Sequence, residues 1–323
     1  MARVLCITLN PALDLAFNLE VLVPGSVNRP TSAQLEAAGK GVNVASVLAG
    51  LGHAVTVSGF LGADNGAPFE LAFAKYSLTD AFVRVPGETR INAKIAEQSG
   101  RVTDINGPGM PIDATHLQAL IDTLNTELAS ATPPQAVVVA GSLPPGLSLD
   151  DFSELLSHLN ASGVPLWVDT SGPALNAAIA TQPAGVKPNE NELAEWAGKD
   201  MTSFDARLTA AKRLHESGIA NVLISAGAEG VLWVNAQGAW QATPPKVTAT
   251  NTVCAGDTFV AGMLHGLLNQ HTPEQTLRFA TALSAEAVRH VGVGTPLAAD
   301  FDSLQQHTRI RRLDDTITEG ATL

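Results

Sequence analysis

The sequence predicts an α/β fold in which a doubly wound, mostly parallel sheet is flanked by helices on both faces. Short apolar, β-branched runs alternate along the chain with longer amphipathic or Ala/Leu-rich stretches, which is typical of β-α-β units. The length of 323 residues predicts about two domains, or one large α/β domain with an appendage. Apolar residues make up 45% and charged residues only 15%, which excludes a disordered chain.

Each expected strand is a short apolar run, and each expected helix is a longer segment with an amphipathic or Ala/Leu-rich pattern. In chain order, strands are expected at Val4–Leu9, Val55–Phe60, Ala136–Ala140, Pro165–Asp169, Gly185–Lys187 and Val222–Ser225. Helices are expected between them at Val42–Leu51, Ala67–Lys75, Ala114–Leu128, Ser148–Leu159, Glu190–Trp196 and Phe204–Ser217. A hairpin over Val231–Val234 and Ala239–Ala242 precedes helices at Thr258–Leu268 and Pro273–His290, and the charged tail Arg309–Leu323 is expected to fray.

Two stretches interrupt this alternation. Residues 15–35 have no helical period, and Arg90–Asn106 alternates apolar and polar residues around a turn at Gln98-Ser99-Gly100. We therefore expect one domain over residues 1–323, with a lid sheet formed by about residues 11–36 and 88–106 beside the main sheet. Such a sheet would be a lid, a dimer contact or both. A plain surface hairpin is the alternative that the pattern leaves open.

Charge and cysteine content limit the partners and the compartment. The formal net charge of −12 disfavours binding to nucleic acid or to an anionic membrane. The two cysteines, Cys6 and Cys254, are far apart, which excludes a disulfide scaffold and the usual zinc motifs. No apolar run approaches the roughly 18 residues that a membrane span needs. We expect a cytoplasmic protein that binds neither nucleic acid nor membranes.

Several common catalytic motifs are missing. The chain has no P-loop, no Gly-x-Gly-x-x-Gly after its first strand, no His-Glu-x-x-His and no Gly-x-Ser-x-Gly. These absences weaken nicotinamide dehydrogenase, metalloprotease and hydrolase interpretations. His53 and His215 are interpreted as packing or surface residues.

The most informative segment is Asn251–Asp257, directly before an expected helix. Small residues there let the backbone amides of Cys254, Ala255 and Gly256 converge on an anion, and the helix dipole adds partial positive charge. Asp257 could accept a proton from an attacking hydroxyl while those amides hold a transferring phosphoryl group. The alternative is an aspartate that stands in a first helical turn because the dipole favours it there.

A second glycine-rich helix entry is Gly39-Lys40-Gly41-Val42-Asn43, where close backbone approach is possible and Asn43 could bond a sugar hydroxyl. Lys187–Glu192 directly follows an apolar strand, at the end where parallel sheets bind ligands. Glu192 could bind Mg²⁺ through water, because that ion keeps its waters and prefers carboxylates. An ordinary loop lysine and an acidic helix N-terminus are the respective alternatives.

Three further features carry weaker signals. The small residues of Ser225–Gly230 suit a base or ribose passing over the backbone, although a tight hairpin connection would look the same. Asp14 could orient substrate hydroxyls or form an Asx-turn after Asn10-Pro11. Arg90 opens the expected lid hairpin and offers a bidentate fork to a phosphate, whereas most lone arginines are surface residues.

Together these motifs resemble the ribokinase-like (pfkB-type) carbohydrate kinases over nearly the whole chain. Gly39–Asn43 is similar to the family's N-terminal motif and Asn251–Asp257 to its C-terminal motif, in which Cys254 replaces the usual first glycine. Within the family the chain is most similar to 1-phosphofructokinases, and tagatose-6-phosphate kinases and the minor 6-phosphofructokinases share much of the pattern. The segments that carry this narrower similarity are Thr8–Asp14, Thr89–Ile95, Val102–Asn106 and Gly141–Gly146.

The resemblance implies transfer of a phosphoryl group from ATP, with Mg²⁺, to the 6-hydroxyl of fructose 1-phosphate. Asp257 would be the base, and Cys254, Ala255 and Gly256 would form the anion hole. The sugar phosphate would be held by Asp14, Gly39, Lys40, Asn43, Arg90 and Ser142. The nucleotide would be held by Lys187, Asn189, Ser225, Gly227, Glu229 and Gly230, with Mg²⁺ organised by Asn189–Glu192. The lid is expected to complete a homodimer.

Other functions stay open at this point. Tagatose 6-phosphate or fructose 6-phosphate is the alternative acceptor, and a catalytically silent nucleotide- or sugar-phosphate-binding protein and a dinucleotide-dependent oxidoreductase are the alternatives from other classes. Cys254 keeps the silent protein open, because a side chain there costs roughly 1 kcal/mol if the position requires positive φ. Since a helix N-terminus lowers a thiol pKa, we also expect Cys254 to be sensitive to oxidation.

Overall fold

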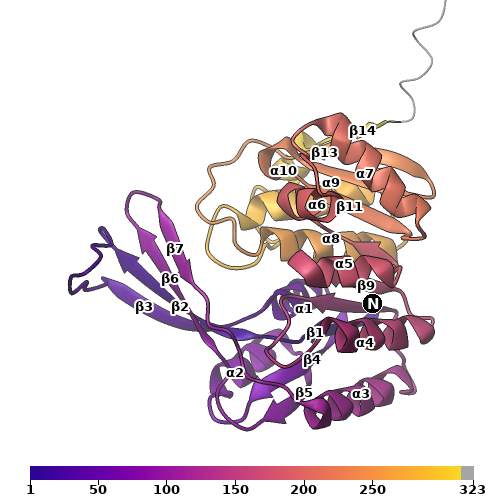
Figure 1. The fold of residues 1–323 in the computed structure, drawn as a ribbon. Helices are drawn as coiled ribbons and strands as arrows, with labels where there is room; N and C mark the ends of the chain where they lie inside the picture. The colour runs from indigo at the N-terminus through magenta and orange to yellow at the C-terminus, as the bar shows by residue number, and fades with distance from the viewer. Residues whose placement is uncertain (314–323) are drawn as a thin grey trace, which may run out of the picture.

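The computed structural model describes residues 1–313 and contains a large sheet covered by helices and a small sheet that stands away from it (Figure 1). The 10-stranded large sheet has the order β14-β13-β12-β11-β10-β9-β8-β1-β4-β5. Its strands are β1 (Arg3–Thr8), β4 (Ala54–Gly62), β5 (Thr79–Val85), β8 (Ala136–Ala140), β9 (Leu166–Asp169), β10 (Gly185–Val186), β11 (Asn221–Ser225), β12 (Val231–Asn235), β13 (Gly238–Thr243) and β14 (Arg309–Arg312). Following the order of the sheet, the strands from its β5 edge to β11 pair in parallel, and β11, β12, β13 and β14 pair antiparallel. This mostly parallel sheet confirms the expected fold class.

Helices cover both faces of this sheet. On one face lie α1 (Lys40–Gly50), α2 (Ala67–Tyr76), α8 (Ala255–Leu268), α9 (Pro273–Ala287) and α10 (Phe301–His307). On the other face lie α3 (Ala114–Leu128), α4 (Leu149–Ala161), α5 (Gly172–Ala180), α6 (Glu190–Ala197) and α7 (Phe204–Glu216). Alternate residues of β1 serve the two cores: Val4 and Cys6 face the first, and Leu5 and Ile7 face the second.

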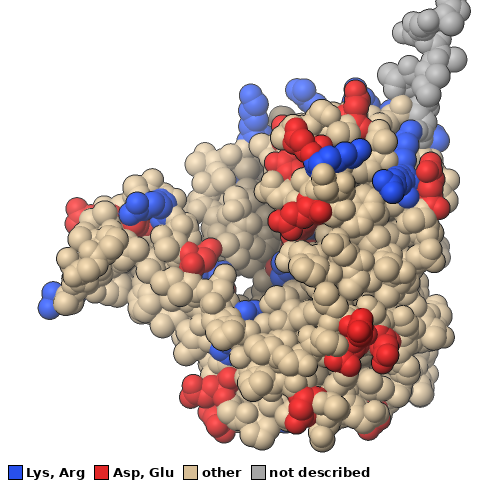
Figure 2. Space-filling model, in the orientation of Figure 1, with Lys and Arg blue, Asp and Glu red and all other residues tan. Residues whose placement is uncertain are grey.

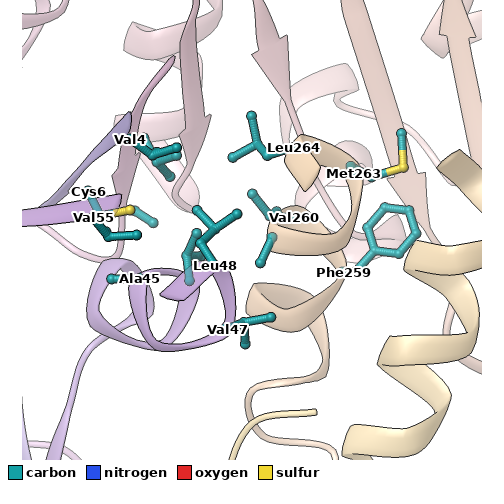
Figure 3. Close-up of a cluster of buried hydrophobic side chains, with 14 of the residues drawn as sticks. Val4, Cys6, Ala45, Val47, Leu48, Val55, Phe259, Val260, Met263 and Leu264 are labelled. Atoms are coloured by element: carbon teal, nitrogen blue, oxygen red, sulfur yellow. The ribbon is translucent and has the colours of Figure 1, made fainter. Parts of the chain in front are cut away.

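The packing of α1 against α8 positions the candidate site. Figure 3 shows Leu48 of α1 facing Val260 and Leu264 of α8, with Val4 of β1 beside them. This buried apolar contact holds the two helices together along their length. It also brings their first turns together, where a side-chain hydrogen bond joins them.

The small sheet joins two segments that are far apart in sequence. Its order is β3-β2-β6-β7, with β2 at Ala12–Leu19, β3 at Ser32–Ala38, β6 at Ile91–Glu97 and β7 at Val102–Ile105. Because side chains alternate along a strand, the register separates two faces. Asp14, Glu36 and Asn92 lie opposite one another on the polar face, and Leu15 pairs with Leu35 on the apolar face. We call this sheet the lid.

Two expectations about single elements need correction or completion. Residues 309–312 do not fray: they form β14 on the edge of the large sheet, where Arg312 stacks over the ring of Trp240. The rest of the expected fraying tail, 314–323, lies outside the described residues. The patterns also missed β5, in which Asp80 pairs with Arg84 and makes the strand look like a polar loop. None of the helices in residues 1–313 combines the length and hydropathy that a bilayer crossing requires.

Candidate active site

The first turn of α8 places backbone amides and a carboxylate together. Cys254 caps the helix without a side-chain hydrogen bond, and its backbone is left-handed, with φ at 68°. The positive φ that would strain a side chain at this position is therefore observed. Asp257 lies in the first turn and is only 5% exposed. The helix thus combines the partial positive charge of its N-terminus with a buried acid.

Asn43 of α1 is in contact with this turn. Its Nδ2 donates a hydrogen bond of 2.7 Å to Asp257 Oδ2 and a longer one of 3.4 Å to Cys254 Sγ. The amide oxygen of Asn43 is not used in either bond. The Asn43 side chain therefore orients the carboxylate and keeps an acceptor for another ligand.

Two glycines place Asn43 there. Gly39 caps α1 with φ at 138°, a conformation that favours glycine. A Cβ at Gly41 would lie 2.4 Å from Oγ1 of Thr8, at the end of β1. Because α1 begins directly against the end of β1, the chain needs glycine at positions 39 and 41.

The environment of Asp257 makes it a stronger base than an exposed aspartate. Burial raises the pKa of Asp257 to about 6, against the opposing effect of Lys40 and the hydrogen bond from Asn43. The negative charge of Asp169 raises the pKa further. A carboxylate with such a pKa is ionised at neutral pH and can still accept a proton from a substrate.

Asp169 ends β9 and is a site residue that sequence analysis did not select. Its Oδ1 lies 3.2 Å from Nζ of Lys40 and 3.5 Å from Nζ of Lys187. Burial alone would raise the pKa of Asp169, but Lys187 and Lys40 together hold it below the usual value. Asp169 in turn raises the pKa of Lys40 against the effect of burial. The available signal was its place as the last residue of a strand in a parallel sheet.

A cleft of about 1490 Å³ opens beside the first turn of α8. Lys187, Ser225, Gly227, Gly230, Ala255 and Gly256 are among its lining residues. The structure thus brings together three segments that sequence analysis had linked only by motif. Gly230 fits at this point because a Cβ there would lie 1.9 Å from the carbonyl oxygen of Ala242.

Asn189, Glu192 and Glu229 have structural partners of their own. Asn189 caps α6 by accepting from the backbone of Glu192, and Glu192 Oε2 accepts from the backbone of Asn189 over 2.8 Å. Glu229 is ion-paired with the buried Arg207, which also pairs with Glu190. The side chain of Glu229 is 65% exposed. The Glu229 carboxylate therefore holds the loop Gly227–Glu229 instead of facing the cleft.

The lid residues lie on the other side of Asp257. Asp14 pairs with Lys94 over 2.6 Å and accepts a hydrogen bond from Asn92, both on the polar face of the lid. The charges of Lys94 and Asp14 act on the pKa of Cys254, so this face is turned toward the first turn of α8. Figure 2 shows a hollow between lid and main body, with Lys or Arg side chains on its floor.

Arg90 has a different set of contacts from the expected phosphate fork. Its guanidinium donates to the carbonyl oxygens of Asn10, Pro11 and Gly107. A fourth, longer contact of 3.3 Å reaches Oγ of Ser142. These bonds tie together the chain segments at the base of the lid, and they occupy most of the donors that a phosphate would use.

The expectation of an oxidation-sensitive Cys254 thiol is not supported by its environment. Burial, followed by the charge of Asp257, raises the pKa of Cys254 to about 12. The helix N-terminus favours a thiolate, whereas burial of the sulfur next to a carboxylate favours the neutral thiol. The thiol therefore stays protonated at neutral pH.

The residues present would fit an Mg²⁺ ion whose ligands are mostly water and substrate phosphate. Within residues 1–313, no group of three or more His, Cys, Asp or Glu side chains could hold a metal ion. Mg²⁺ commonly binds through one or two carboxylates, its own waters and substrate phosphates. Glu192 keeps one carboxylate oxygen beyond the bond to Asn189, and its charge acts on Lys40 at the site.

Comparison with known proteins relates this arrangement to a family. The model of the pfkB family carbohydrate kinases matches residues 1–300. The chain is 42% identical over 315 residues to a 1-phosphofructokinase of Vibrio cholerae serotype O1, covering 98% of both chains. It is 43% identical over 292 residues to 1-phosphofructokinase of Escherichia coli K12, covering 90% of this chain and 93% of the other.

Solved structures agree with this relationship. Phosphofructokinase-2 from Escherichia coli in complex with substrates and products is 30% identical, with a TM-score of 0.87 over 94% of this chain and 98% of the other. A possible 1-phosphofructokinase from Thermotoga maritima is 26% identical, with a TM-score of 0.86 over 96% and 99% of the two chains. The expected resemblance is confirmed, and the chain belongs to the pfkB family of carbohydrate kinases, which makes it a phosphotransferase.

Proposed function

We propose that this kinase transfers the γ-phosphoryl group of ATP to the 6-hydroxyl of fructose 1-phosphate and forms fructose 1,6-bisphosphate. The observation that carries the proposal is the buried Asp257 in the first turn of α8, between a large cleft and the polar face of the lid. The choice of acceptor rests on the curated 1-phosphofructokinases, which are 41–43% identical over most of the chain.

In this reaction Asp257 accepts the proton of the 6-hydroxyl. The hydroxyl oxygen forms a bond to the γ-phosphorus while the bond from that phosphorus to the β–γ bridging oxygen breaks, and ADP leaves with the electron pair. The backbone amides at Ala255 and Gly256 are placed to stabilise charge on the transferring group. Lys187 lines the cleft and supplies positive charge there.

Mg²⁺, when bound, neutralises phosphate charge, and Glu192 is the residue that would hold it through water. Ser225, Gly227 and Gly230 form the part of the cleft wall that suits a flat base or ribose. Asn189 acts on this side as the cap that positions α6.

The acceptor binds on the lid side of Asp257. Asp14 and the amide oxygen of Asn43 can accept hydrogen bonds from sugar hydroxyls, and Lys40 supplies positive charge. Gly39 lets the α1 backbone approach closely. Arg90 and Ser142 shape the base of the lid, so replacing Arg90 by Ala should raise the KM for the sugar phosphate more than the KM for ATP.

Fructose 6-phosphate is a second candidate acceptor. A structure of phosphofructokinase-2 from Escherichia coli in complex with fructose 6-phosphate is 29% identical, with a TM-score of 0.86. The lower identity of this neighbour, compared with the curated 1-phosphofructokinases, makes fructose 1-phosphate the preferred acceptor.

A coupled ADP-release assay with fructose 1-phosphate, fructose 6-phosphate and tagatose 6-phosphate tests the proposal. We expect the highest kcat/KM with fructose 1-phosphate, and the variant Asp257→Asn should lower kcat by several orders of magnitude with little change in nucleotide affinity. A higher kcat/KM with either other sugar would refute the acceptor. ADP release from none of the three, with nucleotide binding intact, would indicate a silent binding protein.

The lid is also proposed to complete a homodimer. Its apolar face carries Leu15, Leu35, Ala93 and Ile105 in register, and Leu35 and Ile105 are 44% and 60% exposed. A one-sided apolar sheet is stable when a second layer covers it, and a symmetric copy of the same face supplies that layer.

Light scattering on Leu35→Asp and Ile105→Asp tests the dimer. We expect both variants to be monomers. The control Leu149→Asp, at an exposed position on α4, should stay dimeric. Unchanged mass in the two lid variants would exclude this face as the interface.

A further inference from the structure

Asp169 is a buried charged residue that belongs to none of the recognised motifs. It stands at the carboxyl end of β9 and is 1% exposed, whereas the recognised motifs lie on α1, α6 and α8. Its Oδ2 is buried and has no hydrogen-bond partner among the described residues. A buried carboxylate with one oxygen unpaired is expensive unless the other oxygen has strong partners.

The partners of the other oxygen come from two sides of the site. Lys187 lines the cleft, and a Cβ at Gly256 would lie 3.4 Å from its Nζ, so this ammonium is next to the first turn of α8. Lys40 belongs to the first turn of α1, one turn before Asn43. A single oxygen of Asp169 therefore holds one cation from the cleft and one from the acceptor side.

The two lysines differ in how strongly they depend on this oxygen. The Lys187 side chain is 6% exposed, so burial confines it even without an anion, whereas Lys40 is 39% exposed and has room to move. Two ammonium groups brought this close repel each other unless a carboxylate lies between them. Asp169 is the residue that makes their convergence stable.

We propose that Asp169 is a positioning residue for phosphoryl transfer, which acts by holding Lys40 and Lys187 together beside Asp257. Asp169 does not touch the substrates. Its negative charge keeps Lys40 at the site before the phosphates bind, so that the positive charge is already in place when the transferring group becomes more negative. The proposal rests on the phosphoryl transfer proposed above and does not depend on which sugar phosphate is the acceptor.

The same charge influences Asp257 directly, which gives a readout that a purely structural role would not move. The groups that act on Asp257 are Lys40 from α1, Lys187 from the segment after β10 and Asp169 from β9, with Asn43 as hydrogen-bond donor. Replacing Asp169 by Asn removes a negative neighbour, which lowers the pKa of Asp257, and releases Lys40, which raises that pKa. The charge of Lys40 acts on Asp257 more strongly than that of Asp169. The acid limb of the kcat/KM profile should therefore move to higher pH.

The test compares wild type, Asp169→Asn and the control Asp122→Asn, which replaces an exposed aspartate on α3. With whichever sugar phosphate the wild type uses best, Asp169→Asn should lower kcat roughly tenfold to a hundredfold and shift the acid limb to higher pH. The control should match the wild type in both quantities. Measuring all three with one substrate cancels the ionisation of the sugar phosphate itself.

Two outcomes would overturn the inference: a kcat within threefold of wild type, or a lowered kcat with an acid limb that stays in place or moves to lower pH. Should Asp169→Asn fold poorly, Lys40→Met and the double variant Lys40→Met/Asp169→Asn remove one of the unpaired cations. Asp169→Asn should lower kcat less in the Lys40→Met background than in the wild type, and an equal loss in both would refute the coupling. A wild type that phosphorylates no sugar phosphate would instead refute the proposed function.

Discussion

The hydrogen bond from Asn43 to Asp257 predicts how activity depends on pH. Asp257 must be ionised to accept a proton, and burial places its pKa at about 6. At pH 5, one unit below this pKa, only about a tenth of the enzyme carries the ionised base, so kcat/KM should be roughly tenfold lower than at pH 7.5. Because kcat/KM reports the ionisation of the free enzyme, the pKa read from the acid limb of its pH profile is that of Asp257 in the environment described above.

The variant Asn43→Ala isolates the contribution of the hydrogen bond. The 2.7 Å bond stabilises the ionised carboxylate, and its removal should raise the pKa of Asp257. We expect the acid limb to move to higher pH by roughly one unit.

The assay is kcat/KM for the sugar phosphate from pH 5 to 8.5 at saturating ATP, in buffers of constant ionic strength. Sugar phosphates themselves titrate near pH 6, so the difference between variant and wild type is the informative quantity. An acid limb at the same pH in both proteins would show that Asn43 does not stabilise the ionised base, and the geometry of this first turn would have to be reconsidered.

Three further predictions concern stability. Cys254→Gly should raise the melting temperature by about 1–2 °C in differential scanning fluorimetry. The left-handed strain that it removes, roughly 1–2 kcal/mol, outweighs the extra entropy that glycine adds to the unfolded chain. A lower melting temperature would mean that the packing of the thiol dominates. Gly41→Ala should destabilise the protein by about 1–3 kcal/mol in urea unfolding, since its Cβ would meet Oγ1 of Thr8 at 2.4 Å, whereas Gly50→Ala, with nothing within 4 Å, should not destabilise it. Stability should also fall in acid because of His53 and His265, whose Nε2 and Nδ1 atoms, respectively, lie 2.9 Å apart. Burial lowers the pKa of both histidines, that of His265 to about 4. The imidazoles bind protons more readily in the unfolded chain than in the folded protein, so the stability contributed by the neutral histidines is fully present above about pH 6.5 and is lost as the pH falls toward 4. His265→Gln should weaken this pH dependence of the unfolding free energy, measured by urea unfolding at pH 7.5 and 5.5.

Short-range features of the site could be predicted because they depend on contiguous residues. The helix entry at Gly39–Asn43 and the first turn of α8 at Cys254–Asp257 were both recognisable, since glycines and small residues next to a helical pattern allow few backbone conformations. For Cys254 the sequence gives only the cost of a side chain if its φ is positive, and the structure shows that φ is 68°.

Residues whose role depends on partners from distant strands could not be assigned in this way. Asp169 looked like the last residue of one strand among several, and only the order of β9 and β10 in the sheet brings it to Lys187. The sequence predicts Arg90 as a phosphate ligand, but it cannot show that the guanidinium also donates to backbone carbonyls at the base of the lid.

The sequence alone determined the fold class, the family and the segments that meet at α8, because periodicity and local backbone constraints are properties of neighbouring residues. Only the tertiary structure decided the charges at the site. The pKa of Asp257 rises because burial and the charge of Asp169 outweigh the opposing effect of Lys40. The Cys254 thiol stays protonated because it is buried beside Asp257. Electrostatic energy depends on separation in space and on exclusion of water, and neither quantity can be read along the chain.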